Sequence, residues 1–412
     1  MKLQAFCPEK TVLLADQVHP LTRFIWCAVG LICWFISSLG FSAVSLSTQC
    51  PPGFDKNQQN RCKLFTMYDA YDSLKDKGVG GLKTGLPARR DGFRPEQIDL
   101  GRYLFFDPIL SAQQDMSCAS CHDPHQGFSD GKGRSVGADG KALARGAPTL
   151  WNSAFLNRFF WDARARGLEE QAKGPLYSVH EMGNDEPSLL NRLNNSKAYR
   201  DLFAQAFPAS NTPGIKSDQI YIALAAFESS LISFNSRYDH YAHGYAEALT
   251  ENELKGLNIF RSFVARCAEC HTPPLFTNQQ VAVLGTPEPE GLPFDIGAET
   301  TFKNKMLKGG FKVPTLRNIA KTAPYMHSGR FANLREAVAF YTKGRGHAVP
   351  DGVELSIHWH IWEPNLTEQE LDFLVDFLKA LTDESFMPRI PEVLPSGLSP
   401  LVGFVKGYQK EL

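Results

Sequence analysis

Two copies of a Cys-x-x-Cys-His motif carry the clearest chemical signal in this sequence. The first copy consists of Cys118, Cys121 and His122, and the second consists of Cys267, Cys270 and His271. Two thiols at this spacing can add to the two vinyl groups of one haem, and the adjacent histidine can then bind the iron as proximal ligand. A single copy would also fit chance, a zinc site or a redox dithiol. Two copies in one chain predict two covalently bound haem c groups.

The N-terminus predicts export from the cytoplasm. Lys2, Lys10 and Arg23 precede an apolar run over residues 24–36, and small residues at 43–45 offer a cleavage site. An uncleaved membrane anchor is the alternative, because weakly apolar residues extend the run to nearly the length of a bilayer span. Either interpretation places the rest of the chain in the periplasm or at the cell surface.

The other cysteines agree with an oxidising environment. Cys7, Cys27 and Cys33 lie in the N-terminal segment, whereas Cys50 and Cys62 follow it and can form a disulfide that closes a short loop. Without the export segment, every cysteine is then assigned either to this disulfide or to a haem motif.

Composition narrows the class of partner. The 412 residues suffice for two domains, and 43 Lys and Arg balance 44 Asp and Glu, which gives a formal net charge of −1. No basic field indicates nucleic-acid binding, and no polybasic stretch indicates binding to anionic lipid. Membrane attachment is expected only if the N-terminal segment is uncleaved.

Helix signals dominate the elements that must position the motifs. The predicted helix starts are Pro95, Ser217 and the capping boxes Thr250–Glu253 and Thr367–Glu370. The last of these precedes apolar residues at i, i+3 and i+4 spacing over residues 371–381. Strand signals are scarce, so the sequence predicts a mostly α fold.

A faint internal repeat indicates two duplicated domains. Pro-Thr-Leu-x-Asn occurs at residues 148–152 and 314–318, each time after one Cys-x-x-Cys motif, and this register aligns Trp161 with His327. The boundary between the halves falls near residues 235–250. The predicted segments are a signal peptide or anchor (1–45), an irregular arm with a disulfide (46–92), a first haem domain (93–242), a second haem domain (243–384) and a C-terminal tail (385–412).

The stretch over residues 147–183 resembles the dihaem cytochrome c peroxidase/MauG family. The resemblance extends over residues 94–384 or so and includes several separated motifs in the same order. It implies two cytochrome c-like domains with one haem each, and a five-coordinate haem on His122 that reacts with hydrogen peroxide. It assigns Trp161 to electronic communication between the haems, and Gln171 and Glu181 to the distal side of the reactive haem.

Side-chain chemistry agrees with these roles but also allows simpler ones. A carboxylate in a partly dry pocket can take and return a proton during O–O cleavage, and an amide can orient peroxide. Gln171 and Glu181 could equally lie on the surface of an amphipathic segment. Trp161 follows Phe159 and Phe160, so that packing in the core is the alternative to an electronic role.

The resemblance also concerns the sixth ligand of the second haem, which is Met in the peroxidases and Tyr in MauG-like enzymes. Tyr341 matches this position and shares an apolar helix face with Leu334 and Val338. A phenolate is a hard anionic donor that favours oxidised iron, whereas the alternative is a packed core tyrosine. The competing ligands are Met326, His327, His347, His358 and His360.

The absence of a histidine from one loop is a further similarity to MauG-like enzymes. The peroxidases carry a distal His in the loop that corresponds to residues 134–145, but this loop contains none here, and His125 lies too near the haem motif to replace it. We therefore expect the first haem to be open without a reductive switch.

The calcium site of the family is only partly matched. The family binds calcium through an Asn side chain and two backbone carbonyls. Thr322 and Pro324 match the carbonyl positions, but Gly146 stands at the position of the Asn. One calcium ion is therefore expected only if carbonyls and water suffice to hold it. Ala163 also replaces a glycine of the family.

Three functions are compatible with these observations. The leading hypothesis is a MauG-like oxidoreductase that uses hydrogen peroxide to form high-valent haem iron and oxidises a substrate at long range, such as Trp or Tyr residues of a partner protein. Trp359 and Trp362 are candidate surface relays, or else ordinary packed residues. The alternatives are a cytochrome c peroxidase that receives electrons from a small cytochrome or cupredoxin, and a dihaem electron carrier without enzyme activity.

Overall fold

The computed structural model describes residues 44–70, 85–210, 213–343 and 347–401. These residues belong to one structural unit, which begins at Val44. Residues 1–43 of the predicted export segment lie outside the described residues. Within the described part of the chain, no helix has both the length and the apolar character that crossing a membrane requires.

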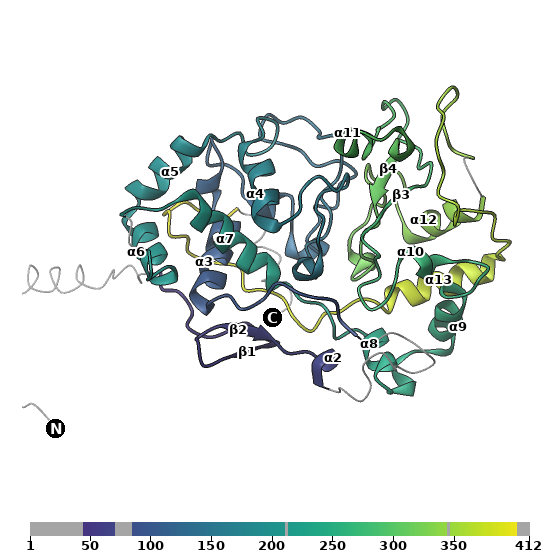
Figure 1. Ribbon diagram of the computed structural model, residues 1–412, viewed down its shortest axis with the longest axis horizontal. Helices are drawn as coiled ribbons and strands as arrows, with labels where there is room; N and C mark the ends of the chain where they lie inside the picture. The colour runs from purple at the N-terminus through teal and green to yellow at the C-terminus, as the bar shows by residue number, and fades with distance from the viewer. Residues whose placement is uncertain (1–43, 71–84, 211–212, 344–346, 402–412) are drawn as a thin grey trace, which may run out of the picture. The chain divides into compact units, whose positions relative to one another are not determined.

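The fold is mostly helical, as predicted, and Figure 1 shows α3 to α7 grouped together and α9 to α13 grouped together. The α-helices up to the middle of the chain are α2 (Met67–Ala70), α3 (Pro95–Phe106), α4 (Leu168–Tyr177), α5 (Glu186–Asn195), α6 (Lys197–Ala206) and α7 (Ser217–Ser229). Those that follow are α8 (Arg237–Ala242), α9 (Glu251–Phe260), α10 (Cys267–Cys270), α11 (Glu299–Phe302), α12 (Leu334–Phe340) and α13 (Glu368–Lys379). The described strands form two antiparallel pairs, β1 (Phe54–Lys56) with β2 (Cys62–Leu64) and β3 (Val281–Val283) with β4 (Gly310–Lys312).

The first half is built around the crossing of α3 and α7. Their apolar faces form a hydrophobic core that includes Leu104, Phe105 and Phe227, which are fully buried. Gly101 permits the close approach of the two helices, because a Cβ atom at this position would lie 1.8 Å from the carbonyl oxygen of Ala223.

Helices α9 and α13 cross in the same way in the second half. Their core includes Leu257 and Phe377, and the apolar stripe predicted on α13 is buried in it. A Cβ atom on Gly256 would lie 1.9 Å from the carbonyl oxygen of Phe373. A glycine at each crossing supports the duplication that the repeat predicted.

The backbone repeats between the halves in the register that aligns the two Pro-Thr-Leu motifs. Positive φ angles occur at three matched pairs, which are Asn152 and Asn318, Phe160 and Met326, and Ala163 and Gly329. An isolated β-bridge recurs as well, between Phe159 and Ala165 and between Tyr325 and Phe331. Ala163 thus adopts, at φ 61°, a left-handed conformation that glycine adopts without steric cost.

Each half also uses segments from beyond its predicted limits. Tyr238 and Ala242 of α8 belong to the second core, although the first domain was predicted to extend to residue 242. In the tail, Leu394 is buried in the first core, and the N–H of Ser396 donates to the carboxylate of Asp107 at 3.3 Å. The domain limits themselves stay a prediction.

The N-terminal arm contains more structure than the sequence indicated. The predicted disulfide between Cys50 and Cys62 is present, with Cα atoms 5.5 Å apart, and Cys62 begins the second strand of the β1–β2 hairpin. The arm was expected to be irregular because strands of three residues are too short to leave a clear alternating pattern.

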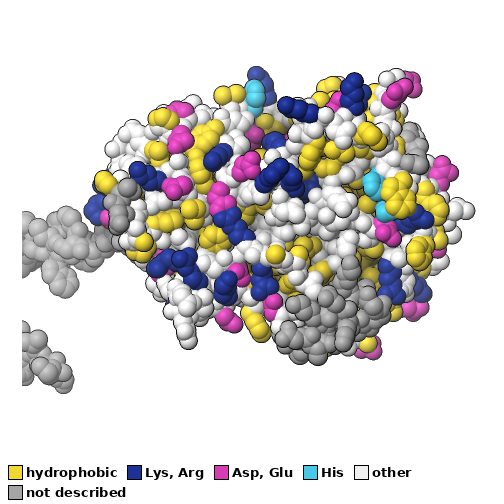
Figure 2. Space-filling view, viewed as in Figure 1, with side chains coloured by type: hydrophobic (Ala, Val, Ile, Leu, Met, Phe, Trp, Pro, Cys, Tyr) yellow, Lys and Arg dark blue, Asp and Glu magenta, His cyan; other side chains and the backbone are white. Residues whose placement is uncertain are grey.

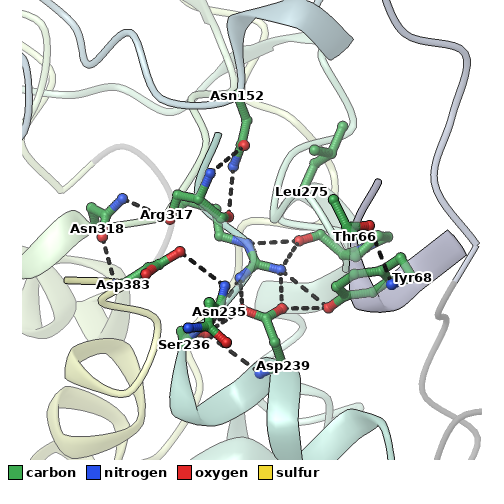
Figure 3. A network of polar contacts seen from close by, with 12 residues as sticks. Thr66, Tyr68, Asn152, Asn235, Ser236, Asp239, Leu275, Arg317, Asn318 and Asp383 are labelled. Atoms are coloured by element: carbon green, nitrogen blue, oxygen red, sulfur yellow. Dashed lines mark hydrogen bonds and ion pairs between the residues drawn. The ribbon is translucent and has the colours of Figure 1, made fainter. Parts of the chain in front are cut away.

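A buried polar network joins the N-terminal arm, through Tyr68, to residues of the second half (Figure 3). The guanidinium of Arg317 donates to both carboxylate oxygens of Asp239, at 2.6 and 2.7 Å, and the hydroxyl of Tyr68 in α2 donates to the same carboxylate. Burial would raise the pKa of Asp239, but the charge of Arg317 and the hydrogen bonds outweigh burial and lower it. Asp239 is therefore an ionised carboxylate whose charge is paired.

The local helix signals are mostly confirmed. Pro95 is the first residue of α3, and the capping boxes at Thr250 and Thr367 are both formed. The prediction for Ser217 was wrong by one residue, because Lys216 occupies the N-cap and Ser217 begins the helix. The N–H of Lys216 donates to the side-chain oxygen of Gln219 at 3.0 Å, whereas the hydroxyl of Ser217 was expected to accept from an N–H of the first turn.

Candidate functional site

The two motif histidines are held in the same way. Nδ1 of His122 lies 2.9 Å from the carbonyl oxygen of Phe128, and Nδ1 of His271 lies 3.1 Å from the carbonyl oxygen of Phe276. A hydrogen bond at Nδ1 fixes the tautomer and the ring orientation, and it leaves Nε2 as the nitrogen that can bind a metal.

The repeated Pro-Thr-Leu motif braces both of these turns. Thr149 donates from Oγ1 to the carbonyl of Gly127, and Thr315 donates from Oγ1 to the carbonyl of Leu275, each at 2.7 Å. The carbonyls that accept from the threonines immediately precede the phenylalanines that hold the histidines. The repeat therefore builds the same support for a histidine in each half.

A cavity of about 470 Å³ lies beside the first motif. Its wall includes Cys118, Cys121, His122, Trp161, Gln171 and Glu181. Cys118 and Cys121 are not joined in a disulfide, and much of the remaining wall is apolar, including Leu176 and Leu224. Two free thiols, a histidine held at Nδ1 and an apolar cavity of the size of a cofactor pocket fit a covalently bound haem.

Gln171 and Glu181 reach this cavity from α4 and from the loop that follows it. The N–H of Ala138 donates to the carbonyl of Glu181 at 3.1 Å, so that the loop over residues 134–145 packs against this segment. Burial raises the pKa of Glu181 and outweighs the charge of Arg164, which lowers it. A carboxylate whose pKa is raised is a stronger base than that of an exposed glutamate, which suits it to accept a proton.

Two further histidines of the first half, His125 and His180, differ in their position relative to the cavity. His125 is exposed, in agreement with the expectation that it does not replace a distal histidine. His180, which the sequence analysis did not single out, lies at the cavity wall next to Glu181. Its side chain is mostly exposed, with Nδ1 3.4 Å from a carboxylate oxygen of Asp139.

Trp161 contacts residues of both halves. Its indole Nε1 donates to the carbonyl of Gly146 at 2.9 Å, and its own carbonyl accepts from the N–H of Lys312 in β4 at 2.7 Å. The ring of His327, its counterpart in the repeat, lies 6.4 Å away and edge-on. This position is compatible both with packing and with a role between two haems.

Tyr341 lies near the second motif, in a 3₁₀ turn that follows α12. Burial and the neighbouring sulfur atoms of Cys267 and Cys270 raise the pKa of Tyr341 above its ordinary value. Two of the competing ligands are close as well, because the ligand atoms of Cys270, His358 and His360 all lie within 4.8 Å of one another. The structure therefore leaves a tyrosine and two histidines as candidate ligands near the second motif.

The other competing histidines are engaged elsewhere. Nε2 of His327 lies 2.8 Å from a carboxylate oxygen of Glu288, and its ring stacks on Phe311 at 3.8 Å. His347 is exposed, with its ring 5.0 Å from that of Phe340.

The residues matched to the calcium site lie beside glycines of both halves. A Cβ atom on Gly127 would meet Thr322 at 2.8 Å, and one on Gly329 would meet Pro324 at 3.0 Å. A Cβ atom on Gly146 would lie 2.8 Å from the carbonyl oxygen of Gly133, so that the backbone at this position leaves little room for the Asn of the family. The calcium ion stays a prediction.

Sequence reasoning missed two buried ionisable residues in the cavity wall. Glu228 of α7 is 7% exposed, one of its carboxylate oxygens is buried without a hydrogen bond, and burial raises its pKa to about 8. Lys312 of β4 is 9% exposed and lines the wall from the second half. The sequence feature that could have drawn attention to Lys312 is its position two residues before the second Pro-Thr-Leu motif.

The candidate relay tryptophans are at the surface and not in the core. Trp359 is 66% exposed and Trp362 is 39% exposed, and the guanidinium of Arg266 lies 6.0 Å and 4.5 Å from their ring centroids. The ring of Trp359 also lies 3.6 Å from that of His360. On the face drawn in Figure 2, hydrophobic side chains and histidines lie next to each other over the second half.

Comparison with known proteins agrees with this geometry. Residues 95–247 match the di-haem cytochrome c peroxidase family. The chain is 36% identical to the methylamine utilization protein MauG of Methylophilus methylotrophus, over 60% of this chain and 72% of that protein. It is 33% identical to cytochrome c551 peroxidase of Nitrosomonas europaea, over 73% of this chain and 85% of that protein. A crystal structure of a MauG-like protein associated with microbial copper homeostasis superposes with a TM-score of 0.68 at 33% identity, over 74% of this chain and 96% of that one.

These matches extend over most of the described chain and include both named branches at similar identity. They establish a haem-dependent oxidoreductase of the peroxidase type. The chain belongs to the di-haem cytochrome c peroxidase/MauG family.

Proposed function

We propose that this protein is a MauG-like oxidase that acts outside the cytoplasm, with one haem c on Cys118, Cys121 and His122 and another on the second motif. The observation that carries the proposal is the position of Tyr341 near the sulfur atoms of Cys267 and Cys270. The peroxidase branch would have a methionine as ligand there. The absence of a histidine from the loop over residues 134–145 favours the same branch.

Hydrogen peroxide would react in the cavity of the first half. A bound haem supplies the electrons for O–O cleavage there. Gln171 orients the peroxide, and the carboxylate of Glu181 takes a proton from one oxygen and returns it to the departing oxygen, so that water leaves. The apolar part of the wall keeps bulk water away from this exchange.

The oxidising equivalents would leave through the second half. Trp161 lies between the cavity and β4, and His360 connects the neighbourhood of Cys270 with the exposed ring of Trp359. A protein substrate, through its Trp or Tyr side chains, could therefore deliver electrons at Trp359 without contact with either haem.

Electron paramagnetic resonance of the ferric protein tests the proposal, with wild type compared with Tyr341→Phe and Tyr341→Met. We expect one high-spin signal and one low-spin His/Tyr signal in the wild type, and loss of both after one equivalent of peroxide. Both variants should lose the His/Tyr signal, and Tyr341→Met should gain a His/Met signal.

Two results would point to the cytochrome c peroxidase branch or to different ligation. A low-spin signal that is unchanged in Tyr341→Phe would exclude Tyr341 and direct attention to His358 or His360. Rapid steady-state turnover with a reduced small cytochrome or cupredoxin would assign the protein to the peroxidases.

A further inference from the structure

Lys312 is a buried cation without a counter-charge in the described part of the chain. It ends β4, lines the first cavity and is only 9% exposed. No described residue accepts a hydrogen bond from its ammonium group, and burial, with no charged neighbour, lowers its pKa to about 8. A buried ammonium group is costly unless an anion pairs with it.

None of the described acidic residues around the cavity pairs with Lys312. Asp162 and Asp295 both pair with Arg145, at 3.0 and 2.7 Å. Glu181 and Glu228 line the same cavity, but neither forms an ion pair or a hydrogen bond with the ammonium group of Lys312. The missing anion must therefore come from what the cavity binds.

We propose that the ammonium group of Lys312 binds a propionate carboxylate of the haem in the first cavity. A haem carries two propionates, and the cavity wall at Lys312 is the part contributed by the second half. The inference rests on the proposed attachment of that haem to Cys118 and Cys121. It adds a residue from the other half of the chain that positions the haem and sets its charge environment.

The backbone around Lys312 makes this position a link between the two haem sites. Its N–H donates to the carbonyl of Trp161 at 2.7 Å. Two residues further on, the backbone of Pro314 interacts with the ring of His271. A salt bridge at Lys312 would thus tie the first haem to the backbone that supports the second histidine.

Lys312→Met should lower the reduction potential of the first haem. Without the cation, the propionate charge is uncompensated and stabilises ferric over ferrous iron. The ferric-to-ferrous ratio at fixed potential should rise about tenfold, which corresponds to about 59 mV for one electron. The measurement is a spectroelectrochemical titration of the full-length haem-loaded protein, with Lys312→Arg as the charge-conserving variant and Lys305→Met, at an exposed lysine before β4, as control.

Resonance Raman spectroscopy gives an independent signal, because the propionate bending band should shift in Lys312→Met and stay in place in Lys305→Met. If Lys312→Met retains both haems with the wild-type potential and bending band, the proposal is wrong. If Lys312→Met loads less haem, restored loading in Lys312→Arg supports the proposal and equally poor loading contradicts it. A haem count by mass spectrometry on the wild type checks attachment separately, so that failure of the haem assignment is not mistaken for failure at Lys312.

Discussion

Glu181 places an ionisable carboxyl group in the wall of a partly apolar cavity, and this position makes its role testable. We expect Glu181→Gln to slow the reaction with hydrogen peroxide by about 10²–10⁴-fold, because glutamine cannot take the proton from one peroxide oxygen and return it to the departing oxygen. The ferric absorption spectrum before peroxide should not change.

Stopped-flow absorption after mixing with peroxide measures this rate. Glu186→Gln, at an exposed glutamate that begins α5, serves as control and should react like the wild type. A wild-type rate in Glu181→Gln would show that another group transfers the proton, and His180 would be the first residue to examine.

Burial of Glu228 should make the folding stability of the protein depend on pH. Burial raises the pKa of Glu228 to about 8 in the folded protein, from an ordinary value of 4.5. The unfolded chain therefore releases this proton first, so that the contribution of Glu228 to stability is intact below about pH 4.5 and is lost as the pH rises toward 8. Glu228→Gln does not ionise, so that its stability relative to wild type should increase over this range, by on the order of 3 kcal/mol in total.

Thermal unfolding of the haem-loaded protein at a series of pH values checks this expectation. The melting curves of wild type and Glu228→Gln should diverge between mildly acidic and mildly alkaline pH. Curves that stay parallel across the series would show that Glu228 is already ionised in the folded protein, or that it is neutralised by a bound group.

At the scale of elements, the glycines at the two helix crossings determine how closely the helices approach. Gly256→Ala should destabilise the second half by about 1–3 kcal/mol, because the new methyl group would overlap the carbonyl of Phe373. Helix propensity alone predicts the opposite sign, since alanine is favoured over glycine in a helix by about 1 kcal/mol.

Urea unfolding distinguishes these two effects. Asn258→Ala, at an exposed position on the same helix, is the matched control and should be neutral or slightly stabilising. Equal stabilisation of both variants would mean that α9 and α13 do not cross closely at Gly256.

The sequence predicted elements best where the signal was local. The capping boxes at Thr250 and Thr367 involve residues three positions apart, and both are formed. The hairpin of the arm was missed because its strands have three residues each and their pairing depends on contacts across a turn. Local pattern therefore predicts helix starts more reliably than it predicts short strands.

The candidate site was predictable to the extent that its chemistry follows a motif. The thiols and histidines of both motifs could be found from spacing, and Gln171 and Glu181 from resemblance. The structure places the first motif, Gln171 and Glu181 around one cavity. Lys312 and Glu228 could not be found in this way, because their significance depends on burial against a cavity that only the folded chain forms.

At the scale of the whole molecule, Arg145 connects the two halves beside Trp161. Its guanidinium donates to both carboxylate oxygens of Asp295, at 2.7 and 2.9 Å, and also pairs with Asp162. Asp295 lies after the second motif, so that this two-pronged ion pair crosses from one repeat to the other, in a largely buried position. Bidentate geometry and partial burial both strengthen such a pair.

A double-mutant cycle with Arg145→Met and Asp295→Asn should therefore give a coupling free energy of about 1–3 kcal/mol in urea unfolding of the haem-loaded protein. The exposed pair Lys197–Asp201 provides the control cycle, in which no coupling should be measurable. The single variants should also reduce electron sharing between the haems, because Arg145 pairs with Asp162, the residue that follows Trp161 in the chain. Additive single variants would mean that Arg145 and Asp295 do not hold the halves together, and that the contact between Trp161 and β4 does so by itself.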